Sequence, residues 1–242
     1  MNGSNTFKLD GKDIPFEDGD TIMDAALRAG EYIPHLCHNP EFPPHGSCRV
    51  CVVNANGRQI SACTQPAMEN IEVDNSSDEI MGQRRALLQM LFVEGNHVCP
   101  GCEKSGACQL QAVAYYANML SPHFTHFFPQ RSVDASHADI AIDYNRCILF
   151  ELCVRASRDV DHKNVFAIDG RGINSQLVIN SPSGKLGDSS FAATDKAAHV
   201  CPVGAILPKH KAYDMPIGER LYDKKPISIV GDVAAHEQDE DR

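Results

Sequence analysis

The ten cysteines constrain this 242-residue chain more than any other feature, because their spacing divides them into three groups. The first group follows C-x10-C-x2-C-x11-C. The second follows C-x2-C-x5-C with a histidine just before it, and the third joins two nearby cysteines to a remote Cys-Pro. Cysteines grouped in this way in a reducing compartment favour metal ligation over disulfides. In chain order the candidate ligands are Cys37, Cys48, Cys51 and Cys63, then His97, Cys99, Cys102 and Cys108, and finally Cys147, Cys153 and Cys201.

Composition excludes several other classes of protein. A hydrophobic fraction of 43% predicts packed cores, and a net charge of −10 argues against a nucleic-acid-binding surface. No stretch of 18 uncharged apolar residues occurs, so we expect no membrane span. The start, MNGSNTFKLDGKD, has no apolar signal core and no arginine-rich transit pattern, and we expect a cytoplasmic protein. Neither GxGxxG nor GxxxxGK[ST] is present, so the sequence predicts no flavin or nucleotide pocket and no catalytic residue on this chain.

The first cysteine group lies among short secondary-structure elements. TFKLDGKDIPF alternates around its DG and predicts a hairpin, and CVVNANGRQISAC predicts a second hairpin around its NG. Residues 21–29, TIMDAALRA, predict a short helix that Asp20 or Thr21 can cap and that Gly30 ends. The cysteine-rich loop PHLCHNPEFPPHGSCRVC connects this helix to the second hairpin.

Hairpin, helix, cysteine loop and hairpin together resemble the β-grasp fold of plant-type ferredoxins, in which four thiolates hold a 2Fe–2S cluster. The plant spacing begins C-x4-C, whereas the ten-residue gap here resembles the 2Fe–2S domains of respiratory complex I and several hydrogenases. The resemblance implies a 2Fe–2S domain over residues 1–77, with Cys37, Cys48, Cys51 and Cys63 as ligands. The alternative is a structural zinc site, although such sites usually carry two C-x2-C pairs and only one is present.

The second group follows a helix predicted over residues 79–95, whose apolar positions recur at helical spacing. HVCPGCEKSGACQLQ then supplies three thiolates, and His97 is the nearest candidate for a fourth ligand, since imidazole also binds iron. The stretch resembles the motif H-x3-C-x2-C-x5-C-x-L-Q of the large iron–sulfur subunit of complex I and of iron-only hydrogenases. His97 departs from it, because it precedes Cys99 by two residues and Gly95 occupies the family position. The resemblance implies a helical 4Fe–4S domain over residues 78–138, with ligands His97, Cys99, Cys102 and Cys108.

The third group contains NRCILFELCVR, where Phe150 stands midway between Cys147 and Cys153. The bacterial 4Fe–4S pattern is C-x2-C-x2-C with a remote Cys-Pro, so this stretch matches it with one replacement. CVR and the remote CPVGAI, which begins at Cys201, resemble the ferredoxin-like domain of the same redox subunits. The resemblance implies a 4Fe–4S ferredoxin-like domain over residues 139–212. Ser157 stands where a ligand of a second cluster would be, so we expect one cluster.

Phe150 cannot bind iron, and the sequence leaves open what replaces the missing ligand. Cys147, Cys153 and Cys201 can hold a 3Fe–4S cluster. Alternatively, a 4Fe–4S cluster takes its fourth ligand from Glu151, a hydroxide or a water. A third alternative is that Phe150 is an engineered or erroneous residue where the parent chain had cysteine.

Two segments lie outside the cysteine groups. His123 and His126 flank Phe124, Phe127 and Phe128, and we expect these aromatic residues to pack between the cluster domains. The remainder, 213–242, is interpreted as an extension that ends in an exposed acidic tail, HEQDEDR.

The order of the three sites resembles the amino-terminal part of the complex I large subunit and of iron-only hydrogenases. The length and the ending PIGERLYDKKPISIVGD most resemble the small iron–sulfur subunit of the diaphorase module in NAD-reducing nickel–iron hydrogenases. This implies an α+β fold and a chain that relays single electrons within an oxidoreductase complex. Its implied partners are a flavin- and NAD-binding diaphorase subunit and nickel–iron hydrogenase subunits. The alternatives are a free-standing soluble ferredoxin, a fragment of a complex I-type subunit, and a zinc-stabilised scaffold.

Overall fold

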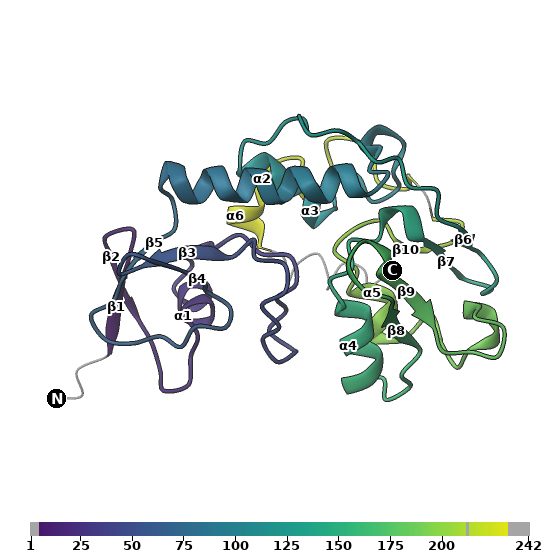
Figure 1. Cartoon of the computed structure of the whole chain (residues 1–242), viewed down its shortest axis with the longest axis horizontal. Helices are drawn as coiled ribbons and strands as arrows, with labels where there is room; N and C mark the ends of the chain where they lie inside the picture. Colours follow the sequence, from purple (N-terminus) through teal and green to yellow (C-terminus); the bar gives the residue numbers. More distant parts are fainter. Residues whose placement is uncertain (1–4, 212, 232–242) are drawn as a thin grey trace.

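The computed structural model describes residues 5–211 and 213–231, which form a mixed structure of helices and strands (Figure 1). An N-terminal sheet and a C-terminal group of short strands lie at opposite ends of the molecule. Helix α2 (Asp78–Glu94) runs across the top, from the sheet toward the C-terminal group. No helix in the described ranges has the length and apolar content needed to cross a membrane. The predicted acidic tail, HEQDEDR, lies outside the described residues.

The N-terminal sheet confirms both predicted hairpins. Its strand order is β2-β1-β5-β3-β4, with β5 parallel to β1 and antiparallel to β3. Each predicted hairpin forms one antiparallel pair, β1 with β2 and β3 with β4. The DG turn connects the first pair and the NG turn connects the second. The strands are β1 (Thr6–Leu9), β2 (Lys12–Pro15), β3 (Val52–Ala55), β4 (Arg58–Ser61) and β5 (Glu72–Asp74).

Helix α1 (Ile22–Arg28) confirms the predicted short helix and is capped by Thr21. The Thr21 hydroxyl accepts a hydrogen bond from the Asp24 backbone N–H at 3.1 Å, and the Asp24 carboxylate accepts one from the Thr21 N–H at 3.0 Å. This capping box fixes the first turn of the helix. The helix buries Ile22 and Met23 in the same core as the sheet, so the cysteine loop that follows starts from a rigid element.

Helix α2 begins and ends one residue before the range predicted for it, 79–95. Its buried positions include Ile80, Arg84 and Leu88, which recur every four residues and therefore lie on one face. Helices α3 (Gln109–Tyr116) and α6 (Ile227–Val230) pack against each other beneath it.

The C-terminal part contains a three-stranded sheet, in the order β10-β7-β6, and a separate β8-β9 hairpin. Two helices and several 3-10 turns connect them. The strands are β6 (Val133–Asp134), β7 (Ile140–Asp143), β8 (Phe166–Asp169), β9 (Gln176–Ile179) and β10 (Ile206–Pro208). The helices are α4 (Leu152–Asp159) and α5 (Lys196–His199), and the 3-10 turns of the chain are η1 (Cys99–Gly101), η2 (Tyr144–Arg146), η3 (Gly172–Asn174) and η4 (Leu186–Asp188).

The predicted packing of the aromatic residues between domains is wrong. Phe124, Phe127 and Phe128 are 47%, 57% and 70% exposed. They lie in a loop without helix or strand, which the Phe127 N–H ties to the carbonyl of Val93 near the end of α2. The loop therefore follows the outside of the helices, and its rings remain at the surface.

One hydrophobic core joins all three parts of the chain. It contains Cys37 and Cys48 of the first group, and Cys108, Cys147 and Cys201 pack against it. Cysteine groups that are far apart in the sequence are therefore held by the same packed side chains.

Candidate metal centres

The four cysteines of the first group are all buried, between 0% and 7% exposed, in the loop between α1 and β3 and just after β4. They lie in two close pairs. The Cys48 backbone N–H donates to the Cys37 sulfur at 3.3 Å, and the sulfurs of Cys51 and Cys63 are 3.3 Å apart. The loop turns through left-handed backbone at Gly46 and Arg49, with φ of 68° and 58°.

Hydrogen bonding prepares one thiol of each pair for ionisation. Bonds from the Cys48 thiol and from the backbone N–H groups of Cys48 and Ser47 lower the pKa of Cys37 to about 6, although burial acts in the opposite direction. A bond from the Cys51 thiol likewise lowers the pKa of Cys63. The donating thiols, Cys48 and Cys51, have raised pKa values because of these bonds and their burial. Thiolate is the form that binds metal, and this loop supplies N–H donors to it.

Two cysteines of the second group border a cavity of about 670 Å³. Cys99 opens the turn η1 and lines this cavity together with Cys102, whereas Cys108 stands at the start of α3. Burial raises the pKa of Cys108 to about 12. The Cys102 sulfur accepts a hydrogen bond from the Arg146 guanidinium at 3.6 Å, and a Cβ added to Gly204 would lie 2.8 Å from the same sulfur.

His97 is half-buried, and its Nε2 atom is buried with no hydrogen-bond partner among the described residues. Burial, with the nearby positive charge of Arg146, lowers the pKa of His97 to about 4, so the imidazole is neutral near pH 7. The ring occupies the space beside Gly95, because a Cβ there would lie only 2.6 Å from Nε2. The His97 ring thus lies where a side chain at position 95, the histidine position of the family motif, would begin.

The third group encloses a small cavity that Cys147, Cys153 and Cys201 all line, with Phe150 beside them. The loop between the first two turns through left-handed backbone at Leu149 and Glu151, with φ of 56° and 60°. Residues other than glycine rarely adopt this backbone conformation. Turns that contain left-handed residues can point successive backbone N–H groups at an anion. Burial raises the pKa of Cys147 to about 11, so an unpaired thiol there stays protonated.

Position 150 belongs to this cavity but offers no donor atom. Phe150 is 8% exposed and lines the same wall as the three cysteines. The Glu151 carboxylate is the other candidate in the lining, and it lies 3.8 Å from His45 of the first cysteine loop.

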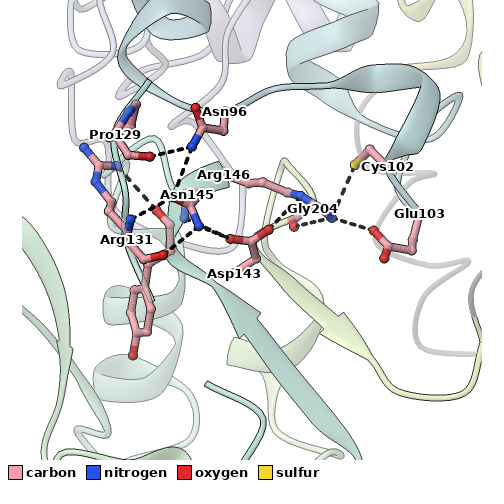
Figure 2. A network of polar contacts seen from close by, with 10 residues as sticks. Asn96, Cys102, Glu103, Pro129, Arg131, Asp143, Asn145, Arg146 and Gly204 are labelled. Atoms are coloured by element: carbon pink, nitrogen blue, oxygen red, sulfur yellow. Dashed lines mark hydrogen bonds and ion pairs between the residues drawn. The ribbon is translucent and has the colours of Figure 1, made fainter. Parts of the chain in front are cut away.

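Polar contacts connect the second and third groups (Figure 2). Arg146, which precedes Cys147, reaches across to Cys102 and also bonds Glu103 and, at 2.9 Å, Asp143. A backbone hydrogen bond also joins the segments that lead into the two groups, since the Asn96 N–H donates to the Asn145 carbonyl at 2.8 Å.

Pro202, next to Cys201, continues this connection. Its carbonyl accepts a hydrogen bond from the Gln109 N–H at 3.0 Å and lies 3.7 Å from the Cys108 sulfur. The second and third groups are therefore neighbours, bound to each other through backbone as well as side chains.

The donor sets fit iron–sulfur clusters. Three thiols line one enclosed space in the third group, four buried thiols lie in pairs in the first, and the second adds an unpartnered imidazole nitrogen. In the described part of the chain, no three His, Cys, Asp or Glu side chains converge on a single-ion site. A cluster distributes its thiolates over two or more iron atoms, so its ligands need not meet at one point.

Sequence reasoning missed several residues beside these sites, above all Arg84, Arg146 and Arg155. Arg84 and Arg155 are buried, and Arg146 donates a hydrogen bond to the Cys102 sulfur. A signal existed for Arg84, which falls on the apolar face of α2 between Ile80 and Leu88.

Comparisons with known families match all three parts. Residues 4–78 match a 2Fe–2S iron–sulfur cluster binding domain, and residues 84–123 match the iron–sulfur binding region of NADH-ubiquinone oxidoreductase G. Residues 140–207 match a 4Fe–4S single cluster domain. The N-terminal and C-terminal parts are thus 2Fe–2S and 4Fe–4S ferredoxin-like domains.

A full-length relative decides the family. The chain is 40% identical over 221 residues to the NAD-reducing hydrogenase HoxS subunit gamma of Cupriavidus necator, and the match covers 90% of this chain and 93% of that protein. The chain belongs to the HoxS gamma subunit family. Outside this family it is 31% identical to the NADPH-Fe(3+) oxidoreductase subunit alpha of Geobacter sulfurreducens, where the match covers 83% of this chain but only 24% of the longer protein.

A solved structure supports the same assignment. The chain is similar to one chain in the crystal structure of an NAD⁺-reducing [NiFe]-hydrogenase in the H₂-reduced state, with a TM-score of 0.93 and 52% identity. The match covers 97% of this chain and 100% of that chain, so the family resemblance extends over the whole fold.

Proposed function

We propose that this chain is the iron–sulfur relay subunit of an NAD-reducing hydrogenase, carrying single electrons between a hydrogenase module and a flavin- and NAD-binding diaphorase subunit. The observation that carries the proposal is the full-length match to a hydrogenase gamma subunit, in a chain whose ten cysteines all fall into three groups. Thiolate-bound clusters exchange single electrons, at potentials set by cluster type, charge and hydrogen bonds.

The ligands of the proposed clusters follow the three groups. A 2Fe–2S cluster takes Cys37, Cys48, Cys51 and Cys63, and a 4Fe–4S cluster takes His97, Cys99, Cys102 and Cys108. A 3Fe–4S or 4Fe–4S cluster takes Cys147, Cys153 and Cys201. The corresponding units are a β-grasp domain over residues 1–77, a helical domain over 78–138, a bacterial ferredoxin-like domain over 139–212 and an extension over 213–242.

The protein's own part in this function is to hold the three sites close together. Four buried cysteines keep the first site out of solvent, and one shared core contains or packs against cysteines of all three groups. Arg146 bonds both the segment of Cys147 and the sulfur of Cys102. An N–H donor to a cluster sulfur favours the reduced form, because it offsets negative charge. Ten free thiols suit a reducing compartment, which is consistent with the cytoplasmic location we propose.

Exposed apolar side chains gather beside the second site and suit a partner surface. Leu120, Tyr115 and Ile217 are 75%, 61% and 85% exposed, and all three line the cavity that Cys99 and Cys102 border. Exposed apolar groups of this kind mark protein–protein contacts. A partner subunit on this face would bring its own redox centre near the second site.

A single ligand substitution in the assembled complex tests the relay. In Cys63→Ala, hydrogen-dependent NAD reduction should fall to background, while dye-linked hydrogen oxidation and dye-linked NADH oxidation by the partner subunits continue. Thr64→Ala, one residue away and exposed, should keep all three activities. Full hydrogen-dependent NAD reduction in a Cys63→Ala complex that lacks the 2Fe–2S signal would place the electron path outside this site.

A further inference from the structure

Helix α2 buries an arginine on its apolar face. Arg84 is 0% exposed and lies one turn from Ile80 and one turn from Leu88, at positions that otherwise hold apolar residues. Burial lowers the pKa of Arg84 to about 10, so the side chain still carries its positive charge near pH 7. A charge in such a place is costly unless something nearby balances it.

The guanidinium of Arg84 is fully hydrogen-bonded, but only to neutral acceptors. Nε donates to the Val50 carbonyl at 3.1 Å and Nη2 to the Val52 carbonyl at 2.7 Å. The other bonds go to the carbonyl and the side-chain oxygen of Asn75, both at 2.6 Å, and to the Met81 sulfur at 3.5 Å. Val50 and Val52 flank Cys51, so the cation is bound to the backbone of the first cysteine group.

A second buried arginine approaches the same group from the C-terminal part. Arg155 of α4 is 5% exposed, and its guanidinium donates to the backbone carbonyls of Cys37 and, at 3.1 Å, Pro43. Its carbon lies 5.4 Å from the centre of the Phe42 ring, and its Nε has no hydrogen-bond partner in the described part of the chain.

Carboxylates do not balance these two charges at close range. Asp10 and Asp74 interact with Arg84 only through space, as do Glu151 and Asp159 with Arg155. Among residues 5–211 and 213–231, no carboxylate forms an ion pair with either guanidinium. Cysteines of the first group do interact electrostatically with the two arginines, Cys51 with Arg84 and Cys37 with Arg155.

We propose that Arg84 and Arg155 supply the positive charge that balances the metal centre at Cys37, Cys48, Cys51 and Cys63, and thereby raise its reduction potential. The inference rests on the proposed 2Fe–2S site. Four thiolates leave such a centre negatively charged, and one added electron increases that charge. A fixed buried cation stabilises the reduced form more than the oxidised form, because buried charges are weakly screened. Each arginine acts on the centre through its charge, which its hydrogen bonds to the cysteine loop hold in place.

The test is a redox titration, followed by electron paramagnetic resonance, of the 2Fe–2S signal in the complete chain. Arg84→Gln keeps a polar side chain but removes the charge. Its reduced-to-oxidised ratio at a fixed ambient potential should fall about tenfold or more, which for a one-electron couple is a downward shift of about 59 mV. Arg84→Lys should stay near the wild-type potential, because it restores the charge.

Two further variants keep the test decisive. Arg58→Gln removes the same charge from an exposed position on β4 and should leave the potential unchanged. Arg155→Gln should lower the reduction potential of the 2Fe–2S signal. If Arg84→Gln does not fold, the potentials of Arg155→Gln and Arg84→Lys together test the inference. Potentials of Arg84→Gln and Arg155→Gln equal to that of Arg58→Gln would overturn the inference, as would an Arg84→Lys potential as low as that of Arg84→Gln. A wild-type chain without a 2Fe–2S signal would instead overturn the proposed function.

Discussion

Replacing His97 with alanine should remove one 4Fe–4S cluster from the chain and leave the other clusters in place. The Nε2 atom of His97 is buried and has no partner among the described residues, and the low pKa of His97 keeps the lone pair available to iron at neutral pH. Iron analysis should show a loss of up to four atoms per chain, about the content of one such cluster. His97→Cys should retain the cluster and lower its potential, because a thiolate adds a negative charge where imidazole adds none.

Two glycine variants test the same geometry without replacing His97. In Gly95→Ala the new Cβ would lie 2.6 Å from His97 Nε2 and 3.0 Å from the Asn145 carbonyl, so the ring must move and cluster content should fall. Gly82→Ala in α2 is the matched control, since its Cβ would meet only the end of the Arg85 side chain at 3.9 Å. Unchanged iron content and spectra in both His97→Ala and Gly95→Ala would assign the fourth ligand to another group.

Replacing Phe150 with cysteine should add a ligand to the third site and lower its potential. Phe150 lines the cavity shared by Cys147, Cys153 and Cys201, at the position where the bacterial pattern has cysteine. A fourth thiolate makes the site more negative and harder to reduce. Iron content should rise if the present cluster is 3Fe–4S, and a redox titration should show the lower potential in either case.

The matched control for this substitution is Phe150→Ala. It removes a similar buried volume but adds no ligand, and the loss of a buried phenyl ring typically costs about 3–5 kcal/mol of folding stability. Both variants should therefore melt at lower temperature without metal, whereas only Phe150→Cys should change the potential in the direction of an all-cysteine cluster. Identical iron content and potential in Phe150→Cys and the wild type would mean that position 150 does not face the cluster.

Local signals predicted the local structure well. The DG and NG turns gave both hairpins of the N-terminal sheet, and the Thr21 capping box gave the start of α1, because turn and cap preferences depend on a few adjacent residues. Helix α2 was predicted within one residue at each end from its apolar period. The family assignment, made from cysteine spacing and the chain's ending, is confirmed by the full-length relative.

What the sequence did not reveal depends on contacts between distant segments. Arg155 bonds a carbonyl 118 positions away, and no local pattern marks an arginine for that role. The rings of Phe127 and Phe128 were predicted to pack between the cluster domains, but in the described chain they are 57% and 70% exposed. The ligand sets of the three sites and the domain limits stay predictions, because they depend on bound iron and on experiments such as those above.

The metal content of this chain, purified anaerobically without partner subunits, tests the central claim most directly. Iron, acid-labile sulfide and zinc should be measured on the same sample, with spectra recorded during reductive titration. A three-cluster relay predicts roughly nine or ten iron atoms on this chain, a similar amount of sulfide and three separate reduction steps. Stoichiometric zinc without sulfide, in a colourless chain that shows no reduction step, would contradict it.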